Sequence, residues 1–75
     1  MEQMIKILMN NGLSRNAAEI MAKDINTCLG IMETVGSMKP EAVIGFYQAA
    51  KERGLGSDYV KGVITIAQKL YSANH

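Results

Sequence analysis

The stretch from Ser14 to Val35 most constrains what this chain can fold into. Apolar residues recur there in steps of three and four, the spacing that lines them up along one face of an α-helix. They are Ala18, Met21, Ile25, Cys28, Met32 and Val35. Ser14 is suited to cap the first turn, because its hydroxyl accepts a hydrogen bond from a free backbone N–H, and Gly36 is suited to end the helix. The sequence therefore predicts a helix of about 30 Å over residues 15–35.

Three shorter helices are predicted around this segment. The first ends at the break before Gly12, and the third begins at Pro40, whose missing N–H is not needed in a first helical turn. Ser57 is the expected N-cap of the last helix, and the residues after position 72 are expected to fray. The four predicted ranges are 2–11, 15–35, 40–53 and 58–72. We therefore predict an all-α fold, a compact bundle of four helices around a long central second helix.

Length and composition point to a single helical domain over residues 1–75. Aromatic residues make up only 5% and tryptophan is absent, so Met, Ile, Leu, Val and Ala must form the core. The one cysteine cannot form an intramolecular disulfide, which favours a reducing, cytoplasmic setting. No apolar run is long enough to span a bilayer and no signal-peptide pattern is present, so no membrane association is expected.

Side chains suited to catalysis are scarce. His75 is the only histidine and the last residue, so no histidine-containing metal site or catalytic triad can be assembled. Cys28 lies on the apolar face of its helix and has no histidine elsewhere to act as its base. The seven carboxylates, Asp24 among them, are scattered, and most of them occupy positions that suit contact with solvent. We therefore expect no enzymatic activity, no cofactor and no bound metal.

The central helix carries more apolar residues than one packing face requires. Either the other helices cover this wide arc, or part of it stays exposed and is buried by a second copy or a partner. We favour the second explanation, and with it a small non-enzymatic interaction module of the adaptor or inhibitor type. It would bind a protein partner through an apolar helix face and form a homodimer. The interface candidates are Ile20, Leu29, Ile31, Met38 and Tyr47, and packing within the monomer would explain each equally well.

A second function follows from a local resemblance. An alanine four residues before a turn glycine, followed by apolar residues at fixed offsets, resembles the pattern of helix-turn-helix proteins. The matching residues are Ala50, Gly54, Leu55, Val60 and Val63. The resemblance implies a DNA-binding regulator that uses helix 58–72, with Ser57, Lys61 and Thr65 as contact candidates. Arg53 departs from the pattern, which is normally apolar there. The net charge of only +1 makes nucleic-acid binding the less favoured alternative.

Overall fold

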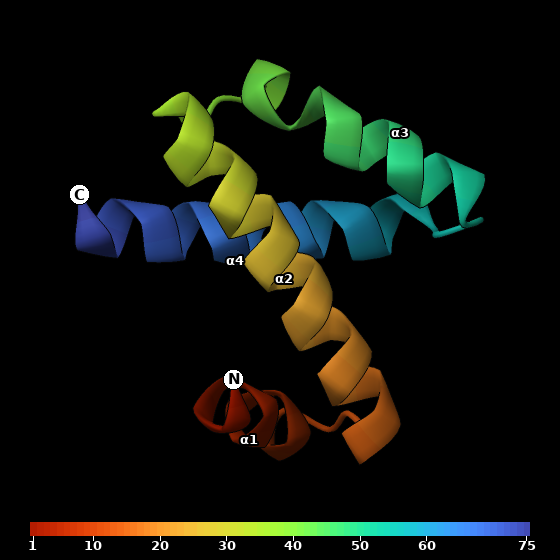
Figure 1. Cartoon of the computed structure of the whole chain (residues 1–75). Coiled ribbons are helices and arrows are strands. Elements are labelled where there is room, and N and C mark those ends of the chain that lie inside the picture. Colours follow the sequence, from red (N-terminus) through yellow and green to blue (C-terminus); the bar gives the residue numbers. More distant parts are fainter.

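Four α-helices and one short 3₁₀ helix make up the chain in the computed structural model, which describes residues 1–75 (Figure 1). The elements are α1 (Glu2–Asn10), α2 (Arg15–Val35), η1 (Pro40–Val43), α3 (Ile44–Glu52) and α4 (Ser57–Asn74). This arrangement confirms the predicted all-α fold with a long central second helix. None of the helices combines the length and the apolar character that crossing a membrane requires.

The helix boundaries differ from the predicted ones at α3 and α4. The first turn of the predicted third helix is the 3₁₀ helix that begins at Pro40, and α3 itself starts only at Ile44. Ser57 is the first residue of α4 and not its N-cap, because the capping position is occupied by Gly56. α4 continues to Asn74, two residues beyond its predicted end at residue 72.

Both predicted ends of α2 are confirmed. The backbone N–H of Ala17 donates a hydrogen bond of 3.2 Å to the hydroxyl oxygen of Ser14, as an N-cap requires. At the other end, the N–H of Gly36 donates to the carbonyl of Met32 at 2.8 Å. Gly36 has a φ of 76°, a left-handed conformation that residues with a Cβ rarely adopt. Local chemistry therefore sets the length of α2.

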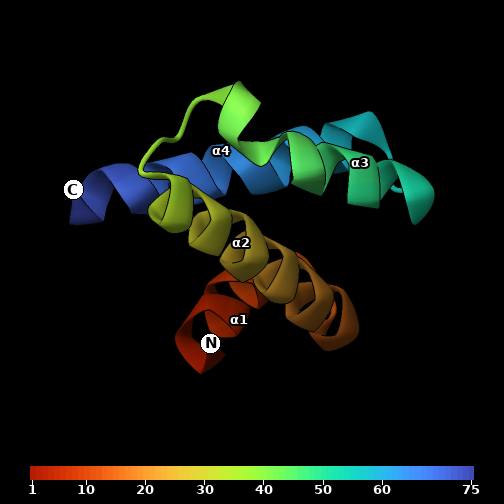
Figure 2. The same cartoon turned by 45° about the horizontal axis from the view of Figure 1, so that its top comes forward.

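The rest of the chain is arranged around α2. The most extensive packing between elements joins α2 to α4, to α1 and to η1. Figure 1 shows α4 crossing α2 steeply, with α1 beside the start of α2 and α3 running along the first half of α4; Figure 2 shows the same order from a second direction. The molecule measures 31 × 30 × 16 Å, so it is only about two helices thick.

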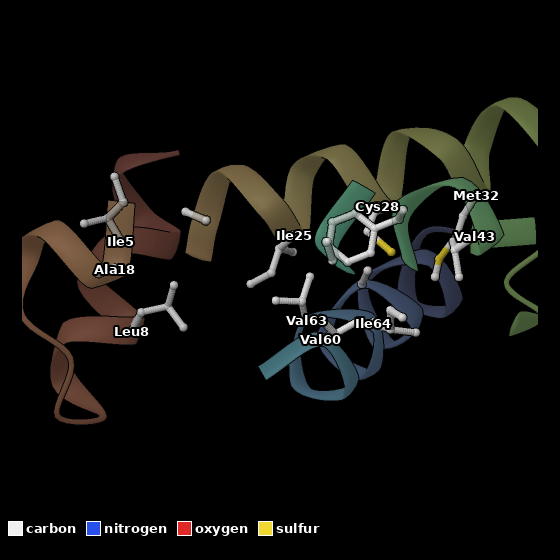
Figure 3. Close-up of a cluster of buried hydrophobic side chains, with 14 residues drawn as sticks. Ile5, Leu8, Ala18, Ile25, Cys28, Met32, Val43, Val60, Val63 and Ile64 are labelled. Atoms are coloured by element: carbon white, nitrogen blue, oxygen red, sulfur yellow. The ribbon is translucent and has the colours of Figure 1, made fainter. Parts of the chain in front are cut away.

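Fourteen buried apolar side chains form a strip along α2 (Figure 3). Five of them come from α2 and have no exposed surface: Ala18, Ala22, Ile25, Cys28 and Met32. Ile5 and Leu8 of α1 cover one end of the strip. Val60 and Val63 of α4 lie near Ile25 in the middle of the strip, and Val43 of η1 lies beside Met32 at its other end. Each neighbouring element therefore buries a different length of the same helix.

The buried face of α2 differs slightly from the predicted one. Ala22 is fully buried although it lies beside the predicted series, Met21 is only half-buried, and Val35 is 58% exposed. The steep crossing in Figure 1 explains the difference, because α4 covers the middle of α2 and does not follow it to its end. A small residue such as Ala22 also suits a close approach between helices.

Asp24 is the one carboxylate that departs from the predicted contact of most carboxylates with solvent. It is only 6% exposed. Arg53 donates a hydrogen bond of 2.9 Å to one carboxylate oxygen, and the Tyr59 hydroxyl donates one of 2.5 Å to the other. We call these three residues the Asp24 clamp. The clamp ties the middle of α2 to both sides of the α3–α4 joint.

The clamp predicts a loss of stability on replacing Asp24. In the variant Asp24→Asn the charge is removed while the shape is kept, so the hydrogen bonds from Arg53 and Tyr59 lose their ionic partner. We expect the free energy of unfolding to fall by about 1–3 kcal/mol, measured by urea denaturation. The matched control is Glu19→Gln, which removes an exposed carboxylate paired with Arg15 at 3.2 Å and should have little effect. Equal effects of the two variants would contradict a structural role for the clamp.

Candidate interaction surfaces

The largest hollow in the surface lies between α1 and α4, and we call it the α1–α4 groove. It has a volume of about 750 Å³, and 8 of its 11 lining residues are apolar. The lining consists of Gln3, Met4, Ile7, Leu8, Asn11, Leu13, Met21, Ile25, Ile66, Lys69 and Leu70. The groove exists because α1 and α4 both pack on α2, while neither packs closely on the other.

The apolar residues of α1 explain why the groove is open. They cover a broad arc of a helix of nine residues, and packing against α2 buries only Ile5 and Leu8. Met4 remains half-buried, and Ile7 remains 58% exposed at the edge of the groove. Sequence reasoning missed these groove residues. The available signal was that one short helix cannot turn so many apolar side chains towards a single neighbour.

The structure places the five predicted interface residues in separate locations. Ile20 is 52% exposed and lines a second hollow of about 460 Å³ beside α1. Leu29 and Ile31 are half-buried against the core, so packing within the monomer accounts for much of their surface. Met38, in the joint before η1, and Tyr47, on α3, are each 40% exposed. The structure does not bring these five residues together into one patch.

A third hollow lies in the corner between α3 and α4, and we call it the corner pocket. Its volume is about 440 Å³. It is lined by Tyr47, Gln48, Lys51, Gly54, Leu55, Ser57, Val60 and Lys61. Two of the three predicted DNA-contact residues, Ser57 and Lys61, therefore lie in this pocket, whereas Thr65 is exposed on α4 outside it.

Both arginines form ion pairs with carboxylates, whereas the lysines do not. Arg15 pairs with Glu2 at 2.9 Å and also with Glu19, and Arg53 belongs to the Asp24 clamp. None of the six lysines forms an ion pair with a carboxylate. The ammonium groups of the lysines are therefore the cations that remain free to meet a partner.

The one cysteine lies in the interior of the molecule. Cys28 is fully buried, and burial raises the pKa of its thiol to about 11 from an ordinary 9.0, which keeps it in the unreactive protonated form. No three side chains of the metal-binding types lie close enough to hold an ion. Every buried side-chain polar atom has a hydrogen-bond partner.

Comparison with known proteins finds no matching family model, no matching curated protein and no matching solved structure. The hollows and charges of the surface are therefore the features from which a function can be argued.

The raised pKa of Cys28 predicts how stability depends on pH. Between pH 9 and about 11 the thiol is ionised in the unfolded chain but protonated in the folded one, so the unfolded state binds fewer protons. Stability should therefore fall as the pH rises through this range. Cys28→Ala should make the pH dependence of the urea midpoint shallower. Part of the slope should remain, because burial also raises the pKa of Tyr59. An unchanged slope in the variant would contradict the burial of the thiol.

Proposed function

We propose that this protein is a small non-catalytic interaction module that forms a homodimer through the α1–α4 groove. The observation that supports this proposal is an apolar hollow of about 750 Å³ left open on a chain of 75 residues. Contiguous exposed apolar surface of this kind is typical of interaction sites. Its exposed edge includes Ile7, an isoleucine that the rest of the chain leaves 58% exposed.

The surface area of the monomer supports a second copy as the occupant. The accessible surface is 4947 Å². A compact monomer of 8.2 kDa exposes about 4,500 Å², so the open shape leaves an excess of roughly 400 Å². A standard interface buries about 800 Å² on each partner. The excess surface alone is thus about half of what a stable dimer needs.

The composition of the groove also favours association with a second copy. Lys69 is its only charged lining residue, and the net charge of the chain is only +1, so two copies repel each other weakly. A two-fold dimer places the same apolar surface on both sides of the contact. Interfaces between permanent partners are enriched in this kind of apolar surface.

A dimer of this kind would act as an adaptor or an inhibitor by holding or covering a partner. The corner pocket and the hollow around Ile20 share no lining residue with the groove. Both therefore remain available for a different protein when the groove is filled. The proposed mechanism is contact and occlusion, with no chemical step.

Substitution of Ile7 tests the dimer. Ile7→Asp places a charge on the exposed edge of the groove, inside the proposed contact, and an unpaired charge buried by association strongly opposes it. We expect the wild-type chain to sediment as a dimer and Ile7→Asp to shift the equilibrium at least tenfold towards monomer, measured by analytical ultracentrifugation at several concentrations. The monomer should stay folded, because Ile7 is 58% exposed.

Val35→Asp is the matched control for this experiment. Val35 has the same exposed fraction of 58% but lies outside the groove, so its replacement should leave the dimer intact. A strictly monomeric wild-type chain, or equal disruption by the two variants, would refute dimerisation through the groove.

A DNA-binding regulator is the second candidate function. It is supported by Ser57, Lys61 and Thr65, which are all exposed and, at intervals of four residues, follow one side of α4. Only one of the three is a cation, and the nearby Arg53 is engaged by Asp24. Phosphate contacts by Arg and Lys dominate the affinity of proteins for DNA. This surface offers too few free cations for such contacts.

An electrophoretic mobility assay distinguishes the two functions. We expect no shift of duplex DNA, even at low salt. A shift that disappears both at high salt and in Lys61→Gln would favour the DNA-binding function, because counterion release makes such binding depend on salt. Dimerisation through an apolar groove should depend on salt only weakly.

A further inference from the structure

The corner pocket combines an apolar floor with two unpaired cations. From this combination we infer that the pocket binds an acidic protein segment that carries a single apolar anchor side chain. The inference goes beyond the proposed dimer, because the pocket shares no residue with the α1–α4 groove and can be tested on a monomer.

The floor of the pocket suits the anchor. Val60 is 4% exposed, and Leu55 is half-buried against the core. Tyr47, which is 40% exposed, adds an aromatic ring to the lining. A volume of about 440 Å³ is at the lower end of the usual range for ligand pockets, about 300–1,000 Å³. The pocket thus accommodates one large side chain and a short stretch of chain.

The rim of the pocket selects the charge of the segment. Lys51 is contributed by α3 and Lys61 by α4, and neither has a carboxylate partner. The nearest acidic residues in sequence, Glu52 and Asp58, are exposed but do not line the pocket. Carboxylates on both sides of an apolar anchor would therefore meet a cation on each wall. Such complementarity favours an acidic segment over a basic or neutral one.

The joint between α3 and α4 holds the pocket in shape before any partner arrives. The N–H of Leu55 donates to the carbonyl of Ala50 at 3.0 Å, and Gly54 takes a φ of 74° to close the turn. The Asp24 clamp then fixes Arg53 and Tyr59, one on each side of the joint. A preformed site loses less conformational entropy on binding than a flexible one.

A protein segment fits the pocket better than a nucleic acid does. The sugar–phosphate backbone offers phosphates to the two lysines but no apolar side chain for the floor. Proteins that bind single strands add several stacking aromatic residues along a basic groove. Tyr47 is the only aromatic residue in the lining, and no arginine is present there.

Peptide titration followed by NMR tests the inference. The probe is a capped hexapeptide with a central leucine flanked by aspartate and glutamate residues, added to the ¹⁵N-labelled Ile7→Asp chain. We expect shifts at the amides of Lys51, Gly54, Leu55 and Lys61. The double variant Lys51→Gln/Lys61→Gln should bind roughly tenfold more weakly, as the loss of two exposed ion pairs implies. Raising the salt concentration should also weaken binding.

The matched control is Lys6→Gln/Lys39→Gln, which removes two lysines outside the pocket and should leave the affinity unchanged. A peptide with serine in place of the leucine should bind more weakly than the probe. The inference is overturned by absence of shifts at millimolar peptide, or by equal binding of a lysine-flanked peptide. It is equally overturned if a single-stranded oligonucleotide binds the pocket more tightly than the acidic peptide. None of these outcomes depends on whether the wild-type chain dimerises.

Discussion

Packing against one helix is the constraint on which the whole structure depends. α1, η1 and α4 each approach α2 closely, and the core is a strip along that helix (Figure 3). Elements that all pack on α2 need not contact one another. The α1–α4 groove is the space that results between two of them. The largest hollow of the molecule, with its mostly apolar lining, is therefore a direct consequence of the way its core is built.

The Asp24 clamp fixes the geometry of the α3–α4 corner, where apolar packing is limited. α3 is only nine residues long and buries just Phe46 and Ala50, which gives it a weak hold on the core. A buried carboxylate with two donors adds a directional constraint, because hydrogen bonds fix geometry more tightly than apolar contact does. The same interaction that stabilises the corner also uses the charge of Arg53. Lysines are left as the cations of the corner pocket.

The sequence was sufficient to predict the helices, and local chemistry explains why. Ser14 and Gly36 act on their own neighbours in the chain, so their effects can be read from a few residues. Asp24 could not be assigned in this way, because its partners lie 29 and 35 positions further along the chain. The groove also depends on segments that are distant in the sequence. Ile7 stays exposed because α4 packs on α2 without packing closely on α1. What sequence reasoning missed were contacts between distant segments.

The thinness of the molecule separates the residues that specify the fold from those that meet other molecules. Only 15 of the 75 residues are buried, and five of these belong to α2 and are completely enclosed. Exposed positions on α1 and α3 tolerate substitution with small changes in stability. Under the proposed function, mutations there alter which molecules the chain recognises without altering how it folds. A protein built in this way can diverge rapidly in binding specificity during evolution while its architecture stays constant.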